Sequence, residues 1–97
     1  GGGVSRYESG EWRNLSMADG LAGNIVYSVA QDSTGAMWFG TNRGLSRYDG
    51  SAFSNFDVMS GLPGNDVYAI AATGASDVWV GTRDGVALLS PKQTTEE

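Results

Sequence analysis

The chain repeats itself with a period of 41 residues, and this repeat restricts its fold more than any other feature. Residues 3–43 align with residues 44–84 without a gap, and 15 of the 41 positions are identical, far more than chance would give. A third copy opens at Gly85 and ends after one expected strand. A fold built from stacked copies of one small unit is therefore expected.

Each unit is expected to contain four short strands separated by turns rich in Gly, Asp and Ser. One full set covers residues 25–31, 37–41, 45–48 and 53–56. A second set covers residues 66–72, 78–82 and 86–89, and residues 4–7 and 12–15 match the third and fourth strands of a unit. The second strand is apolar nearly throughout, so both of its faces are expected to be buried.

Four strands in about 40 to 45 residues is the period of a β-propeller blade. Small residues alternate along the first strand, where crowding at the centre of a ring would require them. Trp38 and Trp79 occur once per unit, as plates packed between neighbouring blades would. The fold class is therefore all-β, with about two four-stranded antiparallel propeller blades per chain and a ring completed by other chains. A β-solenoid is the main rival, but its rungs are usually much shorter.

Composition sets further limits. The 97 residues include no Cys and no His, so the chain cannot form disulfides, a thiolate zinc site or a histidine general base. Because a chain this small buries a modest core, we expect assembly with other chains to supply the remaining stability. A net charge of −5 argues against nucleic-acid binding. No apolar run is long enough to span a membrane, so no membrane contact by this segment is expected. We expect candidate tag residues at 1–3, a two-blade segment at 3–90 and a flexible tail at 91–97.

The repeat resembles a known family. Residues 61–70 read Gly-Leu-Pro-Gly-Asn-Asp-Val-Tyr-Ala-Ile, and residues 38–50 read Trp-Phe-Gly-Thr-Asn-Arg-Gly-Leu-Ser-Arg-Tyr-Asp-Gly. Both are similar to the two-component regulator propeller repeat, over residues 3 to about 89. The resemblance implies a bacterial signal-transduction sensor that lies outside the cytoplasm and binds ligands, often oligosaccharides. Family sensors carry many more repeats together with transmembrane and kinase segments.

A weaker resemblance involves the pattern Ala30-x-Asp32-x-Thr34-Gly35-x-x-Trp38, which is similar to the tryptophan-docking motif of quinoprotein dehydrogenase propellers. Its spacing is one residue short, and the copy that ends at Trp79 lacks both the Asp and the Gly. A piece of a propeller enzyme, of lyase or quinoprotein type, therefore remains an alternative.

Candidate ligand-binding residues are those that differ between the copies at an exposed turn. Asn42, Arg43, Arg83 and Asp84 occupy the turn between the second and third strands, which in propellers rims one end of the central channel. Arg can hold an anion bidentately, and Asn or Asp can bind sugar hydroxyls. A carbohydrate or a small anion is the expected ligand class.

Residues shared by both copies are expected to be structural. They are Asn24 and Asn65, Trp38 and Trp79, Gly40 and Gly81, and Thr41 and Thr82. No nucleophile–base pair and no calcium loop is visible, so no catalytic residue, metal or cofactor is expected.

The leading interpretation is a non-enzymatic propeller module whose ring is closed by identical chains, with six or eight blades favoured. Two blades leave apolar flanks and open strand edges, both of which favour association. The expected strand at residues 85–90 is a copy of the third strand of a blade. It is one strand more than the ring needs, because the hairpin of a neighbouring chain would supply the third strand of that blade. A truncated or engineered fragment with no ligand is the other alternative.

Overall fold

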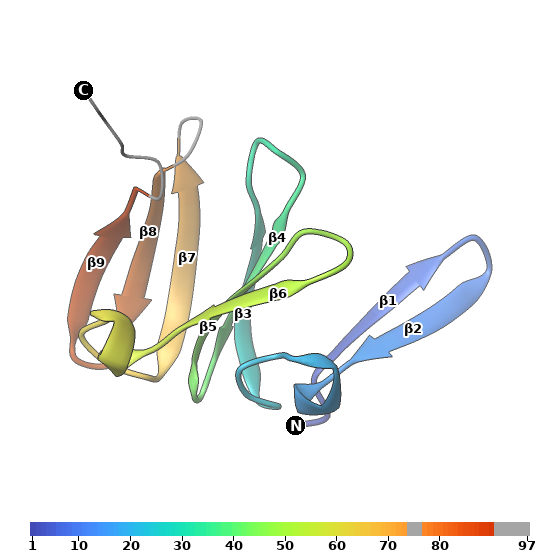
Figure 1. The fold of residues 1–97 in the computed structure, drawn as a ribbon, viewed down its shortest axis with the longest axis horizontal. Helices are drawn as coiled ribbons and strands as arrows, with labels where there is room; N and C mark the ends of the chain where they lie inside the picture. The colour runs from blue at the N-terminus through green and yellow to red at the C-terminus, as the bar shows by residue number, and fades with distance from the viewer. Residues whose placement is uncertain (74–76, 91–97) are drawn as a thin grey trace.

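The computed structural model describes residues 1–73 and 77–90, and these form nine strands and two 3-10 turns in an all-β arrangement (Figure 1). The strands are β1 (Val4–Glu8), β2 (Glu11–Leu15), β3 (Val26–Gln31), β4 (Met37–Thr41), β5 (Gly44–Tyr48), β6 (Phe53–Phe56), β7 (Val67–Thr73), β8 (Asp77–Thr82) and β9 (Gly85–Leu89). No helix among these residues has the length and apolar character needed to cross a membrane. The expected tail at 91–97 lies outside the described residues.

The strands form three antiparallel sheets that follow one another along the chain. The hairpin β1–β2 comes first, then the four-stranded sheet β3–β4–β5–β6, which we call blade B, then the three-stranded sheet β7–β8–β9, which we call sheet C (Figure 1). This is the predicted inventory: half a blade, one complete blade and most of another. The bounds of β4 and β6 are as predicted, and the other strands differ by one residue at one or both ends.

The link between units contains a 3-10 turn that the sequence analysis did not predict. Ser16 caps the turn Met17–Asp19, and Asp57 caps the equivalent turn Val58–Ser60, each through a reciprocal capping box. Gly20 closes the first turn with a φ of 116°. Because a side chain at this φ would be strained, the position requires glycine.

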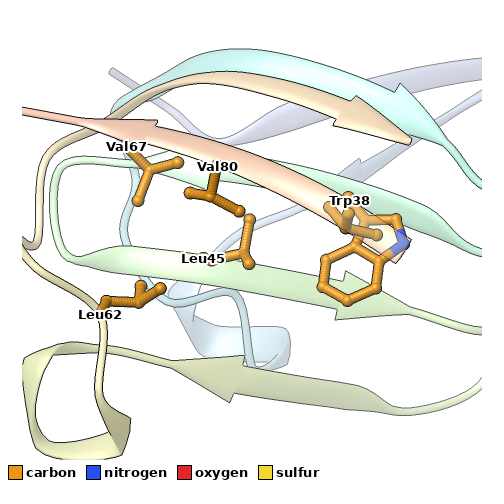
Figure 2. Packing of buried hydrophobic residues seen from close by; sticks show 6 residues of the cluster. Trp38, Leu45, Leu62, Val67 and Val80 are labelled. Carbon is orange, nitrogen blue, oxygen red and sulfur yellow. The ribbon is translucent and has the colours of Figure 1, made fainter. Parts of the chain in front are cut away.

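The main core lies between blade B and sheet C (Figure 2). It joins one side of blade B, represented by Trp38 and Leu45, to the facing side of sheet C, represented by Val67 and Val80. Trp38 is 1% exposed, and its ring stacks on Phe56 with centroids 6.0 Å apart. Trp38 is therefore the plate between blades that the repeat predicts.

Trp79 differs from Trp38 although it occupies the same place in the repeat. Its side chain points away from blade B, and the residue is 46% exposed because no described element covers that side of sheet C. The prediction that both faces of the second strand are buried is thus correct for β4 and wrong for β8. Strand β9 pairs with β8, so within this chain the additional third strand occupies the sheet edge that a neighbour's hairpin would need.

Candidate functional site

The two turns that carry the predicted ligand-binding residues lie beside the loops that lead into β3 and β7. The backbone N–H of Asn42 donates to the carbonyl of Ile25 at 3.0 Å, and the N–H of Arg83 donates to the carbonyl of Asp66 at 3.1 Å. Each turn is therefore bonded to the start of its own first strand. We call this edge, formed by residues 23–27, 41–44, 64–68 and 82–85, the rim.

Thr41 and Thr82 shape the rim turns. The hydroxyl of Thr41 donates to the carbonyl of Gly44 at 2.8 Å and accepts from the N–H of Arg43 at 3.0 Å. Thr82 repeats this arrangement, donating to Gly85 at 2.9 Å and accepting from the N–H of Asp84 at 3.1 Å. The two threonines thus hold the backbone from which the candidate ligand-binding side chains project.

Asn42 also has a structural contact, because its Oδ1 accepts from the N–H of Ile25 at 3.4 Å. Opposite the rim turn of sheet C, a Cβ placed on Gly64 would lie 2.7 Å from Oδ2 of Asp84. The loop glycine therefore leaves the space that this carboxylate occupies. Asn42 and Asp84 consequently pack closely against the loops that enter β3 and β7.

The rim also contains an aromatic pair that was not predicted from the sequence. The rings of Tyr27 and Tyr68, on β3 and β7, have centroids 4.9 Å apart, and both residues remain nearly half exposed. The hydroxyl of Tyr27 donates to Oδ1 of Asp66 at 3.5 Å. Desolvation, followed by the charge of Asp66, raises the pKa of Tyr27, so this hydroxyl stays a neutral donor at neutral pH. The recurrence of Val-Tyr 41 residues apart was the available signal.

Asn24 and Asn65 hold the loops that lead to the rim. Oδ1 of Asn24 accepts from the N–H of Met17 at 2.8 Å, and Oδ1 of Asn65 accepts from the N–H of Val58 at 3.0 Å. Each side chain therefore joins the 3-10 turn of the preceding link to the start of the next inner strand. Both side-chain oxygens are consequently occupied by the backbone.

The residues of the quinoprotein-like pattern, from Ala30 to Trp38, form a cluster of hydrogen bonds at the opposite end of blade B from the rim. Oδ2 of Asp32 accepts from Nε1 of Trp38 at 2.8 Å and lies 3.4 Å from Nε of Arg47, whose guanidinium sits 5.7 Å from the Trp38 ring centroid. Burial by itself would raise the pKa of Asp32. Hydrogen bonds from the Thr34 hydroxyl, the Trp38 indole and the N–H groups of Thr34 and Ala36 outweigh burial and lower this pKa to about 2. Such a carboxylate stays ionised at neutral pH and stabilises the blade.

Gly40 and Gly81 have different surroundings despite their equivalent positions. A Cβ on Gly40 would meet the Ser28 hydroxyl and would lie 2.5 Å from the carbonyl oxygen of Val67 in sheet C. A Cβ on Gly81 would find its nearest neighbour, the Ala69 Cβ, at 3.6 Å, an ordinary contact. Glycine is therefore required where blade B meets sheet C, and the isolated chain does not require it at residue 81.

The described residues contain no group of three or more acidic side chains placed to hold a metal ion. The two repeats instead present a polar and aromatic rim. The model of the two-component regulator propeller family matches residues 20–43 and 61–84, which are equivalent halves of the two 41-residue units.

The chain belongs to the two-component regulator propeller family. Among solved structures, it is similar to the extracellular domain of the hybrid two-component system BT3049 from B. thetaiotaomicron, with 28% identity and a TM-score of 0.69. The similarity covers 81% of this chain but 12% of that one, so the propeller-repeat chain spans a small part of its neighbour's length. No curated protein matches it. The predicted family and the predicted all-β class with antiparallel propeller-blade sheets are thus confirmed.

Proposed function

We propose that this chain is a non-enzymatic module that supplies two blades to a sensor propeller, and that identical chains complete the ring. The observation that carries the proposal is the apolar outer side of sheet C, where Trp79, Val86 and Leu88 are 46%, 69% and 45% exposed. A contiguous exposed apolar patch of this kind favours association. Contacts of a head-to-tail type close into a ring when the rotation between copies allows it.

Two blades per chain make trimers or tetramers the favoured assemblies, with six or eight blades. The third strand is the point of competition, because β9 of one chain and β1 of the next are copies of the same strand. Either β9 leaves β8 and the hairpin of the neighbour replaces it, or that hairpin stays displaced. A longer chain that supplies the flanking repeats is the alternative source of the missing blades, and the extracellular neighbour supports an extracytoplasmic location.

Native mass tests the assembly. Light scattering or native mass spectrometry at micromolar concentration is expected to give three or four times the chain mass of 10.1 kDa. A stable monomer throughout the micromolar range would contradict assembly from identical chains and would leave flanking repeats as the source of the other blades.

Ligand binding at the rim is a second proposal, supported by the exposed Tyr27–Tyr68 pair. Aromatic rings can stack on sugar faces, while the predicted residues at the same edge offer hydrogen bonds or positive charge: Asn42, Arg43, Arg83 and Asp84. Neutral or acidic oligosaccharides are the ligand class that fits this mixture.

Calorimetric titration with a panel of neutral and acidic oligosaccharides tests the rim. We expect Tyr68→Ala to weaken binding and Tyr7→Ala, which removes an exposed tyrosine from the hairpin, to leave it unchanged. Equal affinities of the two variants would place the ligand elsewhere, and a panel without any binder would oppose the carbohydrate proposal.

A further inference from the structure

The 41-residue repeat allows each face of the chain to be compared with its copy. Inside the chain, one side of blade B packs on the facing side of sheet C, and this contact buries Trp38. Adding 41 to the blade B residues gives the outer side of sheet C, where Trp79 and Val86 replace Trp38 and Leu45. The outer side of sheet C therefore corresponds to the side of blade B that packs on sheet C, and it could make the same kind of contact with another blade.

The surface that would receive such a face is also present in the chain, on the opposite side of blade B, and it is only partly covered. Subtracting 41 from Ile70, Val78 and Val80 gives Val29, Met37 and Phe39 on the side of blade B that faces the hairpin. These three residues line a groove of about 430 Å³, whose other wall includes Val4 and Leu15 of the hairpin. Val29 is 54% exposed in this groove.

The groove is a copy of the main core without its tryptophan. Val4 and Leu15 correspond to Leu45 and Phe56, which surround Trp38 in the main core. No described residue occupies the place that Trp38 fills in the main core, because the lining of the groove contains no tryptophan. Trp79 lies on the side of sheet C that no described element covers.

We propose that the groove of one copy receives Trp79 of a second copy, with the hairpin of the first copy replacing β9 beside β8 of the second, so that β7 and β8 of the second copy pack on blade B of the first. This proposal rests on the proposed assembly from identical chains and specifies its contact. The occupant is a second copy because its outer face carries the same tryptophan, at the same place in the repeat, that fills the equivalent core within the chain.

A further difference between the repeats supports the contact. Gly40 permits the close approach of the Val67 carbonyl, whereas no described residue approaches Gly81 as closely. In the proposed contact, Gly81 would face Val26 of the second copy, and its lack of a side chain would serve the same purpose.

Two substitutions test the two halves separately, by sedimentation velocity on the 97-residue chain. Trp79→Ala removes the anchor, and Val29→Lys places a charge in the groove at a position that is already half exposed, so folding should survive. Because a buried interface tryptophan typically contributes about 2 kcal/mol or more, each variant should weaken association by about thirtyfold or more. The controls are Trp12→Ala and Val58→Lys, which change an exposed tryptophan and an exposed valine outside the groove.

Mixing the variants tests the head-to-tail geometry. Trp79→Ala retains an intact groove and Val29→Lys retains an intact Trp79, so an equimolar mixture should form a pair with one functional contact, whereas each variant alone stays monomeric. Gly81→Ala should leave the far-ultraviolet spectrum unchanged and weaken association, because its methyl group is accommodated in the chain but not in the contact.

The outcomes separate this proposal from the broader one. If the unmodified chain assembles and Trp79→Ala and Val29→Lys assemble equally well, the proposed contact is wrong while assembly from identical chains stands. If the unmodified chain is a monomer throughout the micromolar range, both are wrong. If the variants dissociate but their mixture fails to pair, the head-to-tail arrangement is wrong.

Discussion

The carboxylate of Asp32 offers the most quantitative test of how blade B is held together. Its side chain is 9% exposed and receives hydrogen bonds from Trp38 and Thr34 and from the N–H of Ala36. These contacts favour the charged form and lower the pKa from 3.8 to about 2. A shift of this size corresponds to about 2 kcal/mol of folding free energy at neutral pH.

The sign of the pH dependence follows from the lowered pKa. Well above pH 3.8, Asp32 is ionised in the folded and unfolded chains, and its full contribution to stability is present. As the pH falls further, the unfolded chain takes up the proton first, and the contribution is lost as the pH passes through about 2. Acid therefore weakens the unmodified blade within this window.

Asp32→Asn keeps the shape of the side chain and removes its charge. At pH 7 we expect the variant to be less stable by about 2 kcal/mol in urea unfolding followed by circular dichroism, because the charge-assisted bonds are weakened. The difference from the unmodified chain should shrink as the pH falls towards 2. Glu11→Gln, which removes an exposed carboxylate from the hairpin, should show neither effect. A destabilisation by Asp32→Asn that is the same at pH 7 and at pH 2.5 would refute the reasoning.

Three further substitutions test the packing. Gly40→Ala should destabilise the chain by about 1–3 kcal/mol through overpacking against Val67, whereas Gly81→Ala should change the free energy of unfolding by less than about 1 kcal/mol, and equal effects in chemical denaturation would contradict the contact geometry. Asn65→Ala should cost about 0.5–2 kcal/mol because the N–H of Val58 loses its acceptor, and an unchanged thermal midpoint would show that water replaces the amide. Ser28→Ala should be neutral or stabilising by up to about 1 kcal/mol, since the Ser28 hydroxyl finds no hydrogen-bond partner among the described residues, and a clear loss of stability would reveal a missed bond.

The strands and their order were predictable from the sequence because both depend on local information. The alternation of side chains defines each strand, and glycine and aspartate mark the turns. Because the unit recurs after 41 residues, each strand assigned in one copy can be compared with the other copy. The 3-10 turns were missed although their capping residues, Ser16 and Asp57, are visible in the sequence. A three-residue turn has too short a pattern to stand out from a glycine-rich loop.

The rim was predictable in part. The positions of Asn42, Arg43, Arg83 and Asp84 beside the loops that enter the inner strands follow from blade topology. The Tyr27–Tyr68 pair was not found, because an exposed aromatic residue that recurs with the repeat looks the same as a core residue when only its spacing is known. Whether these side chains bind a ligand remains a proposal.

Residue order alone was enough to predict the repeating unit and its four strands. Which of two equivalent residues is buried depends on the tertiary packing. Trp38 is buried and Trp79 is half exposed, and a Cβ would clash with the Val67 carbonyl at Gly40 but make only ordinary contacts at Gly81. The physical reason is that burial belongs to a contact between two units, and the last unit described has no following unit against which to pack.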